Sequence, residues 1–252
     1  MLTTIERIDQ NNEKDFLRFI QNFHALGIKM GAHYHSYGTR FPFCSFWIQV
    51  CEGKMVGALC KYYGELFVIS DYLDETLEGF LRLFYENATI WMPYELGKAF
   101  VNGKSVHSIH AGHVMKKNPE EIYPRSHLQI SCNTEVKDML SVLGLKKEET
   151  ELLYCDYIRK ISKGLGAVYA YRRDEKYVAA ASVLLSEDAL LLENIRTLPA
   201  YRQKGYVKML VEIIQSCYNK KEIYLLSKNA FTDQVYIRLG LQPAGKYIRI
   251  GM

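Results

Sequence analysis

The nine residues Pro199-Ala-Tyr-Arg-Gln-Lys-Gly-Tyr-Val207 place two cations and a glycine at the start of an apolar segment, 206–218, whose spacing predicts a helix. The first N–H groups of a helix have no acceptor within it, and the helix dipole favours negative charge there. Gly205 permits a positive φ, and Arg202 and Lys204 supply charge for phosphate oxygens. The residues therefore fit a diphosphate-binding loop, although an ordinary strand-to-helix turn with solvated cations fits them equally well.

The elements that would position this loop occur twice in the sequence. In each half, three strand-like segments joined by short turns precede a helical segment. Lys54–Ala58 aligns with Lys176–Ala180, which indicates an internal duplication, although a chance similarity of two β-meanders is the alternative. The expected strands are 43–50, 55–63 and 66–70 in the first half and 166–172, 177–185 and 189–197 in the second; the expected helices that follow them are 74–88 and 206–218, and further strands are expected at 222–228 and 245–250.

The remaining segments set the domain organisation. The first 30 residues have apolar side chains at helical spacing and are expected to be helical. The aromatic and polar stretch 33–40 is expected to be a loop that packs its aromatic rings, or a part of an acceptor pocket. Prolines and glycines punctuate the middle of the chain, so we predict two domains, residues 1–125 and 126–252.

Composition and charge narrow the classes of function. The chain has 252 residues, 48% of them hydrophobic and 24% charged, as in ordinary globular proteins. Residues 1–125 hold 13 Lys and Arg against 14 Asp and Glu, and residues 126–252 hold 19 against 14. This excess is too small for a dedicated nucleic-acid-binding protein but suits a small polyanion. We see no signal peptide, no apolar run of the roughly 18 residues that span a membrane, and no CxxC pair, and we expect a cytoplasmic location without membrane association.

Two sequence motifs are similar to those of the GNAT superfamily of N-acetyltransferases. TLPAYRQKGYVKMLV resembles the acetyl-coenzyme A motif R/Q-x-x-G-x-G/A, in which Arg202 and Gly205 match and Val207 replaces the usual small residue. Downstream, a second segment resembles N-x6-Y-x-K-L-G-F, and its matching residues are Asn229, Tyr236, Leu239 and Gly240, with Leu241 in place of Phe. The chain also looks like two-domain bacterial members whose N-terminal half is a degenerate GNAT domain.

The resemblance implies an α/β (α+β) fold of two GNAT-like domains, each with a mixed, mostly antiparallel sheet flanked by helices. It implies acetyl-CoA as cosubstrate, no metal, and direct attack by a primary amine of a small molecule or peptide. Tyr236 would protonate the coenzyme A sulfur, and Glu193 would be the base, unless it is simply a solvated or structurally paired glutamate. The residues expected to bind the cofactor are Thr197, Leu198, Arg202, Gln203, Lys204, Gly205, Tyr206, Val207 and Asn229.

Other classes of function stay open beside the enzyme. A non-catalytic acyl-CoA-binding or regulatory module would keep the same loop but lack an acceptor site. An aminoacyl-tRNA-dependent transferase also uses paired GNAT-like halves, but it should carry an extended basic surface, which the acidic first half does not offer. His107, His110 and His113 would place two histidines on one face of a helix, yet no carboxylate pattern accompanies them, so we expect ordinary histidines and no metal site.

Overall fold

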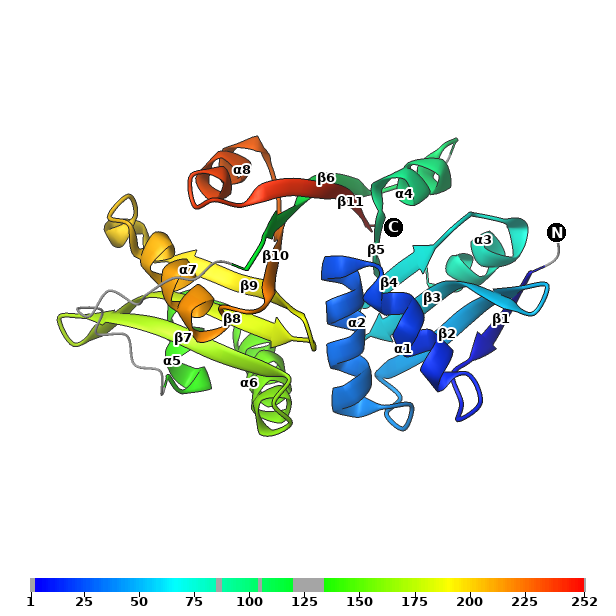
Figure 1. Ribbon diagram of the computed structural model, residues 1–252, viewed down its shortest axis with the longest axis horizontal. Helices are drawn as coiled ribbons and strands as arrows, with labels where there is room; N and C mark the ends of the chain where they lie inside the picture. Colours follow the sequence, from blue (N-terminus) through cyan, green and yellow to red (C-terminus); the bar gives the residue numbers. More distant parts are fainter. Residues whose placement is uncertain (1–2, 85–87, 104–105, 120–133, 252) are drawn as a thin grey trace. The chain divides into compact units, whose positions relative to one another are not determined.

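The computed structural model describes residues 3–84, 88–103, 106–119 and 134–251 (Figure 1). The chain divides into two compact units. Unit 1 comprises residues 1–115, 226–234 and 243–252, and unit 2 comprises residues 116–225 and 235–242. The predicted domain boundary between residues 125 and 126 lies outside the described residues and stays a prediction.

Unit 1 is built on a sheet in the order β1-β2-β3-β4-β5-β11-β6. β4 and β5 run parallel, while β1–β2, β2–β3, β3–β4 and β5–β11 pair antiparallel. The last strand of the chain thus pairs with a strand of the first half. The strands are β1 (Thr3–Arg7), β2 (Cys44–Cys51), β3 (Lys54–Tyr62), β4 (Glu65–Ser70), β5 (Thr89–Pro93), β6 (Ser108–Lys117) and β11 (Gln242–Gly251).

Helices cover both faces of this sheet. α1 (Glu13–Gln21) and α2 (His24–Tyr37) bury side chains such as Phe16 and Met30 against one face, in a cluster with Phe46 and Phe67. The other face packs against α3 (Glu75–Arg82) and α4 (Tyr94–Val101). Unit 1 is therefore a three-layer arrangement with a hydrophobic core on each side of the sheet.

Unit 2 has a smaller sheet in the order β10-β9-β8-β7. β7–β8 and β8–β9 are antiparallel and β9–β10 is parallel, so this sheet too is mixed and mostly antiparallel, as predicted. The elements are α5 (Val136–Leu143), α6 (Lys147–Ser162), β7 (Gly166–Arg173), β8 (Lys176–Leu185), β9 (Ala189–Thr197), α7 (Tyr206–Cys217) and β10 (Glu222–Ser227). α8 (Ala230–Ile237) contributes residues 230–234 to unit 1 and 235–237 to unit 2.

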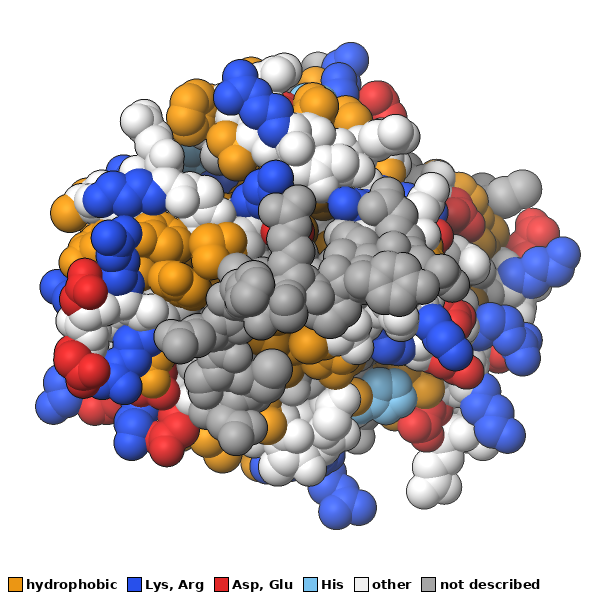
Figure 2. Space-filling model, turned by 60° about the vertical axis from the view of Figure 1, so that its left-hand side comes forward, with side chains coloured by type: hydrophobic (Ala, Val, Ile, Leu, Met, Phe, Trp, Pro, Cys, Tyr) orange, Lys and Arg blue, Asp and Glu red, His pale blue; other side chains and the backbone are white. Residues whose placement is uncertain are grey.

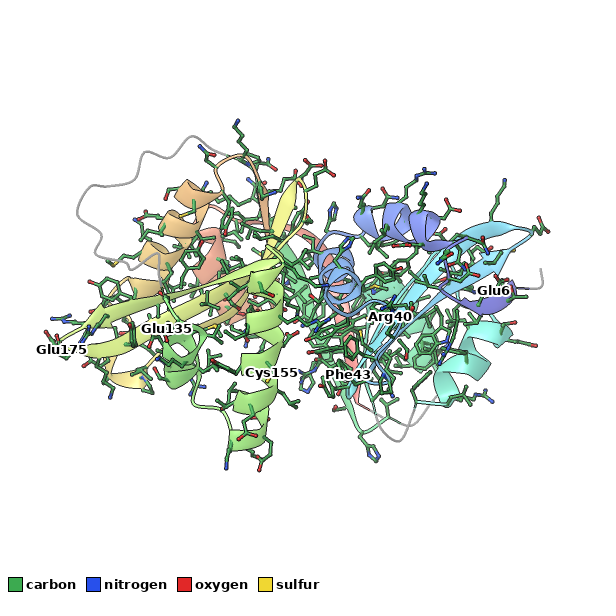
Figure 3. All side chains as sticks on the ribbon, turned by 90° about the horizontal axis from the view of Figure 1, so that it is seen from below. Glu6, Arg40, Phe43, Glu135, Cys155 and Glu175 are labelled. Carbon is green, nitrogen blue, oxygen red and sulfur yellow. The ribbon has the colours of Figure 1, made fainter. Side chains whose placement is uncertain are left out.

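Helices flank the sheet of unit 2 on both faces. α5 packs against β8 and α6 against β7, and α7 packs against β7, β8 and β9. Figure 3 shows α5 and α6 on one side of the β7–β8 hairpin. Glu135 marks the start of α5, Cys155 lies on α6, and Glu175 lies in the turn of the hairpin. The chain therefore consists of mixed sheets flanked by helices, which confirms the predicted fold class.

The two meanders share a detail that supports the predicted duplication. In each unit the first hairpin turn has two residues at positive φ, Glu52–Gly53 in one and Asp174–Glu175 in the other. Directly after each turn the register shifts, so that Val56 in unit 1 and Val178 in unit 2 are the extra residue of a β-bulge. Both valines occupy the third position of the aligned segments, and the same irregularity at the same position argues against chance.

Two expectations for the N-terminal region were wrong. Residues 3–7 form β1 rather than helix, because they pair along β2 from Thr3 to Arg7. Residues 33–37 are the end of α2 rather than a loop, and His33 is buried there with its ring stacked on Tyr62 at a centroid distance of 3.9 Å. The sequence reading also missed β5, α4 and β6 in the middle of the chain.

Candidate active site

The predicted phosphate site is the loop of residues 199–205, which leads into the exposed N-terminus of α7. Its glycine, Gly205, is the N-cap in the left-handed conformation (φ 83°, ψ 4°), and no described side chain caps the helix. The chain before it forms a short 3-10 turn, η1 (Pro199–Tyr201), and Gln203 also has a positive φ of 62°. A Cβ at Gly205 would meet no described atom within 4 Å. The first turn of α7 therefore offers N–H groups to an open space.

Both cations of this loop are exposed and contact only the loop itself through the hydrogen bonds described. Arg202 Nε donates to the carbonyl oxygen of Thr197 at 3.3 Å, and Lys204 Nζ donates to that of Ala200 at 3.2 Å. Lys204 also lies over the Tyr201 ring, 5.2 Å from its centroid. Because solvent-exposed contacts of this kind contribute little free energy, the two side chains can turn toward an anion at small cost.

Not every predicted cofactor residue can contribute its side chain. The Tyr206 side chain is buried, with its hydroxyl accepting a 2.7 Å hydrogen bond from Arg173 Nη1 and its ring 4.9 Å from that of Tyr171. Only the backbone N–H of Tyr206 is therefore available at the helix start. Val207, the next residue, is half-buried at the second position of α7.

A second β-bulge of unit 2, which was not predicted from the sequence, lies in β9 shortly before this loop. β9 has two residues, Asn194 and Ile195, opposite the single Ala181 of β8. Asn194 adopts a positive φ of 53°. Asn tolerates this left-handed conformation better than most residues, and a bulge bends the strand that carries it. The polar pair Glu193-Asn194 within an apolar strand was the signal in the sequence that could have indicated it.

The parallel ladder between β9 and β10 stops at the bulge. Its last described pair is Leu192 with Leu225, whereas β9 continues to Thr197. On its other edge β9 keeps its antiparallel partners on β8 through this stretch. Among the described residues, segment 193–197 thus has one paired edge and one edge without a ladder, and such an edge can pair with an extended ligand.

Two further contacts mark the end of β9. Arg196 donates from Nη1 to the carbonyl oxygen of Leu143, the last residue of α5, where a cation is favoured by the helix dipole. The Thr197 hydroxyl is buried and has no hydrogen-bond partner among the described residues. A buried hydroxyl without a partner is costly, and a ligand in this position would satisfy it.

Glu193, the predicted base, belongs to a hydrogen-bonded cluster on the face of the sheet that α6 covers. Tyr157 of α6 lies with its hydroxyl 2.6 Å from Ser182 Oγ and 3.4 Å from Glu193 Oε2. Asn194 Nδ2 donates to both hydroxyls, at 3.2 Å to Tyr157 and 2.8 Å to Ser182. Burial raises the pKa of Tyr157 well above its usual value, and the Glu193 carboxylate raises it further, so the phenol keeps its proton.

Tyr236, the predicted acid, lies in the last turn of α8. Burial raises its pKa to about 12, and its proton is therefore held throughout the neutral range. The helix closes on a glycine: Gly240 has a φ of 84°, its N–H donates to Ile237 O, and the Leu241 N–H donates to Tyr236 O. These two bonds are those of a Schellman motif, and Leu241 is buried beneath it.

The other predicted residues are placed as follows. Glu193, Thr197 and Leu198 share one continuous segment with the loop, and Tyr236 belongs to the same unit. Asn229 belongs to unit 1, where its Oδ1 accepts a hydrogen bond of 3.0 Å from the Thr232 N–H and so caps α8. The assignment of these residues to catalysis and cofactor binding stays a prediction.

The three histidines do not form a helical pair, because residues 108–117 are strand β6. His113 Nδ1 lies 2.8 Å from Asp233 Oδ2. Within residues 3–84, 88–103, 106–119 and 134–251, no group of three or more His, Cys, Asp or Glu could hold a metal ion. In the same ranges, none of the helices has the length and apolar character that crossing a membrane requires.

Comparison with known proteins identifies the fold. No family model matches the sequence, and no curated protein matches it significantly. The structure is similar to a tandem GNAT protein from the clavulanic acid biosynthesis pathway, with a TM-score of 0.61, 11% identity, and coverage of 99% of this chain and 98% of that one. A GCN5-related N-acetyltransferase from Sphaerobacter thermophilus gives a TM-score of 0.62 at 10% identity, with 98% and 94% covered.

A third solved structure, a GNAT-family acetyltransferase from Colwellia psychrerythraea, gives a TM-score of 0.55 at 11% identity and covers 98% of both chains. At these identities the likeness concerns the fold. The chain therefore has a two-domain GNAT fold, and the resemblance inferred from its motifs is confirmed at that level.

Proposed function

We propose that the protein is an acetyl-CoA-dependent N-acetyltransferase whose active site lies in unit 2 and whose acceptor is a primary amine. The observation that carries the proposal is the open edge of β9. Its ladder with β10 ends at Leu192, and the strand then leads directly into the uncapped, positively charged start of α7. An edge that can pair with a pantetheine arm thus continues into a site for its diphosphate.

The chemistry requires a base, a means of polarising the thioester carbonyl, and an acid. In the proposed reaction the amine nitrogen attacks the carbonyl carbon, and its surplus proton passes to Glu193 directly or through water. A backbone N–H near Thr197 stabilises the oxyanion. The C–S bond then breaks, and the leaving thiolate takes the proton of Tyr236, which burial keeps in place at neutral pH. The products are an amide and free coenzyme A.

Acetyl-CoA specificity and an amine acceptor are tested together by a panel of primary amines, with free thiol measured as the product. Turnover that needs both acetyl-CoA and one class of amine, and that falls at least about 10-fold in Glu193→Gln, supports the proposal. Coenzyme A binding without thiol release from any amine favours the non-catalytic acyl-CoA-binding module instead. Absence of coenzyme A binding would overturn both.

The aminoacyl-tRNA-dependent class is the less favoured alternative. Acidic and basic side chains both occur on the face drawn in Figure 2, whereas a binding surface for a large polyanion should be uniformly basic. Acetyl transfer to an amine in the absence of any RNA would exclude this class as the main activity.

A further inference from the structure

The cluster formed by Tyr157, Ser182 and Asn194 lies outside the reaction proposed above, yet it is buried at the point where β9 bulges. Ser182 and Tyr157 are almost fully inaccessible to solvent, at 0% and 1% exposure. Buried polar groups of this kind are costly unless each has a partner, and here they satisfy one another. Removal of one member takes a hydrogen-bond partner from the others, so the cluster is fully satisfied only when all three are present. The complete cluster fixes the backbone of β9 at Asn194.

Every proton of this cluster has an acceptor. The two hydrogens of Asn194 Nδ2 go to the Tyr157 and Ser182 hydroxyls. If Tyr157 donates to Ser182, then Ser182 donates to the Glu193 carbonyl oxygen, 3.3 Å away. If Ser182 donates to Tyr157, the phenol donates to the Glu193 carboxylate. In both arrangements the chain of hydrogen bonds ends on Glu193.

Asn194 therefore acts through both its backbone and its side chain. Its backbone supplies the positive φ that the bulge needs, and its amide ties that bulge to α6 and β8. The third strand of the meander in unit 1, β4, offers the contrast, because it pairs with β3 in continuous register and is only six residues long. Of β4 and β9, only β9, which runs into the Gly205 loop, has a bulge that side-chain hydrogen bonds tie to a helix.

We infer that Tyr157, Ser182 and Asn194 are positioning residues, which hold the bulge of β9 so that segment 193–197 keeps an edge open for the pantetheine arm and Glu193 faces the acceptor amine. The inference rests on the proposed function. Without the side-chain amide, the bulge loses its tie to α6, and segment 193–197 can move relative to the loop that follows it. The diphosphate site, formed by the loop and the start of α7, should not depend on this tie.

The test compares two ligands in the full-length protein. One is coenzyme A, and the other is 3′-phosphoadenosine 5′-diphosphate, which is coenzyme A without its pantetheine arm. Asn194→Gly removes the amide but accepts the left-handed backbone without strain. We expect it to weaken coenzyme A binding about 10-fold, as the loss of one or two positioned hydrogen bonds would, and to leave the affinity of the nucleotide within about 2-fold. Tyr157→Phe should likewise weaken coenzyme A binding and leave the affinity of the nucleotide within about 2-fold.

A matched control is available on strand β7 of unit 2. The Tyr169 hydroxyl of β7 donates to the Tyr218 hydroxyl at 3.3 Å, so Tyr169→Phe also removes a tyrosine hydrogen bond, but one that involves none of Asn194, Ser182 and Glu193. It should leave both affinities unchanged. Thermal melting of all variants shows whether each is folded at the temperature of the assay.

The outcomes separate the two proposals. If the wild-type protein binds both ligands but Asn194→Gly and Tyr157→Phe bind coenzyme A normally, only the positioning role is overturned. A parallel loss of both ligands in these variants would also overturn it, since that pattern reports general damage to the unit. If the wild-type protein binds neither ligand, the proposed function and the positioning role fall together.

Discussion

At the scale of single residues, Tyr236 is the position at which a substitution best separates the proposed enzyme from a binding module. Its pKa is raised to about 12, and burial is the cause. A phenol in this state carries a proton at neutral pH. A thiolate is less basic than this phenolate, so the donation matters only while negative charge builds on the sulfur in the transition state. Its catalytic value would therefore show in turnover rather than in ground-state affinity.

Tyr236→Phe should lower kcat on the true acceptor by about 10²-fold and leave the acetyl-CoA dissociation constant unchanged. The variant keeps the ring and its packing and loses only the hydroxyl. Steady-state kinetics and calorimetry on the same preparation give the two numbers. Turnover at the wild-type rate would make Tyr236 a packing residue, and the transferase would then need another acid.

The raised pKa of Tyr236 also predicts a pH dependence of stability. The unfolded chain ionises this phenol near pH ~10 and the folded chain near pH ~12, so wild-type stability is lost as pH rises through this window. Tyr236→Phe has no such loss. Relative to wild type, its free energy of unfolding should therefore rise by about 1 kcal/mol between about pH 9 and pH 11. Urea unfolding at several pH values measures this difference in the free energy of unfolding between the variant and wild type. A difference that does not change with pH would show that Tyr236 ionises at its ordinary pKa in the folded chain.

At the scale of elements, the loop between β9 and α7 combines an unusual backbone with free space. Gly205 has a φ of 83°, and a Cβ there would meet no described atom within 4 Å. The glycine is thus required by backbone conformation and not by packing against the described residues. Gly53 in the β2–β3 turn has the same two properties, with a φ of 75°.

This equivalence gives a test that separates strain from ligand contact. Asn accepts a left-handed backbone, so Gly205→Asn should melt within a few degrees of wild type yet lose the thermal shift caused by coenzyme A, because its side chain occupies the ligand's space. Gly205→Val should lose the shift and about 1–2 kcal/mol of stability as well. Gly53→Asn is the control. A normal coenzyme A shift in Gly205→Asn would place the diphosphate elsewhere.

At the scale of the whole molecule, the two units repeat one meander but differ where its third strand meets a helix. In unit 1, Asp74 caps α3: its carboxylate accepts from the Leu77 N–H at 2.8 Å and from Gln49 Nε2 at 3.2 Å. Glu75 and Glu78 add negative charge to the same turn. The position that α7 leaves open for an anion is therefore filled in α3 by the protein's own carboxylate.

One coenzyme A should consequently bind per chain. Titration calorimetry on the intact protein should give a single site, and the combined variant Arg202→Ala with Gly205→Val should remove it completely. Two sites in the wild-type protein, or one site that survives in the combined variant, would mean that unit 1 binds the ligand despite its acidic helix start.

The sequence by itself determined the elements whose signals are local. Strand-like apolar segments joined by short turns predicted both meanders, and Gly205 predicted the start of α7. Each of these signals acts within a few residues of the chain, through φ, capping or period, so composition and spacing suffice to recognise it.

Tertiary structure decided what depends on distant partners. β11 was predicted as the last strand of the second domain, yet it pairs with β5, a choice that no local pattern encodes. α2 is buried on most of its surface, which hides the helical period, and its Gly27 packs where a Cβ would lie 1.8 Å from Ile20 O. The β9 bulge likewise needs Tyr157 and Ser182, 37 and 12 positions from Asn194 in sequence, to be held in place.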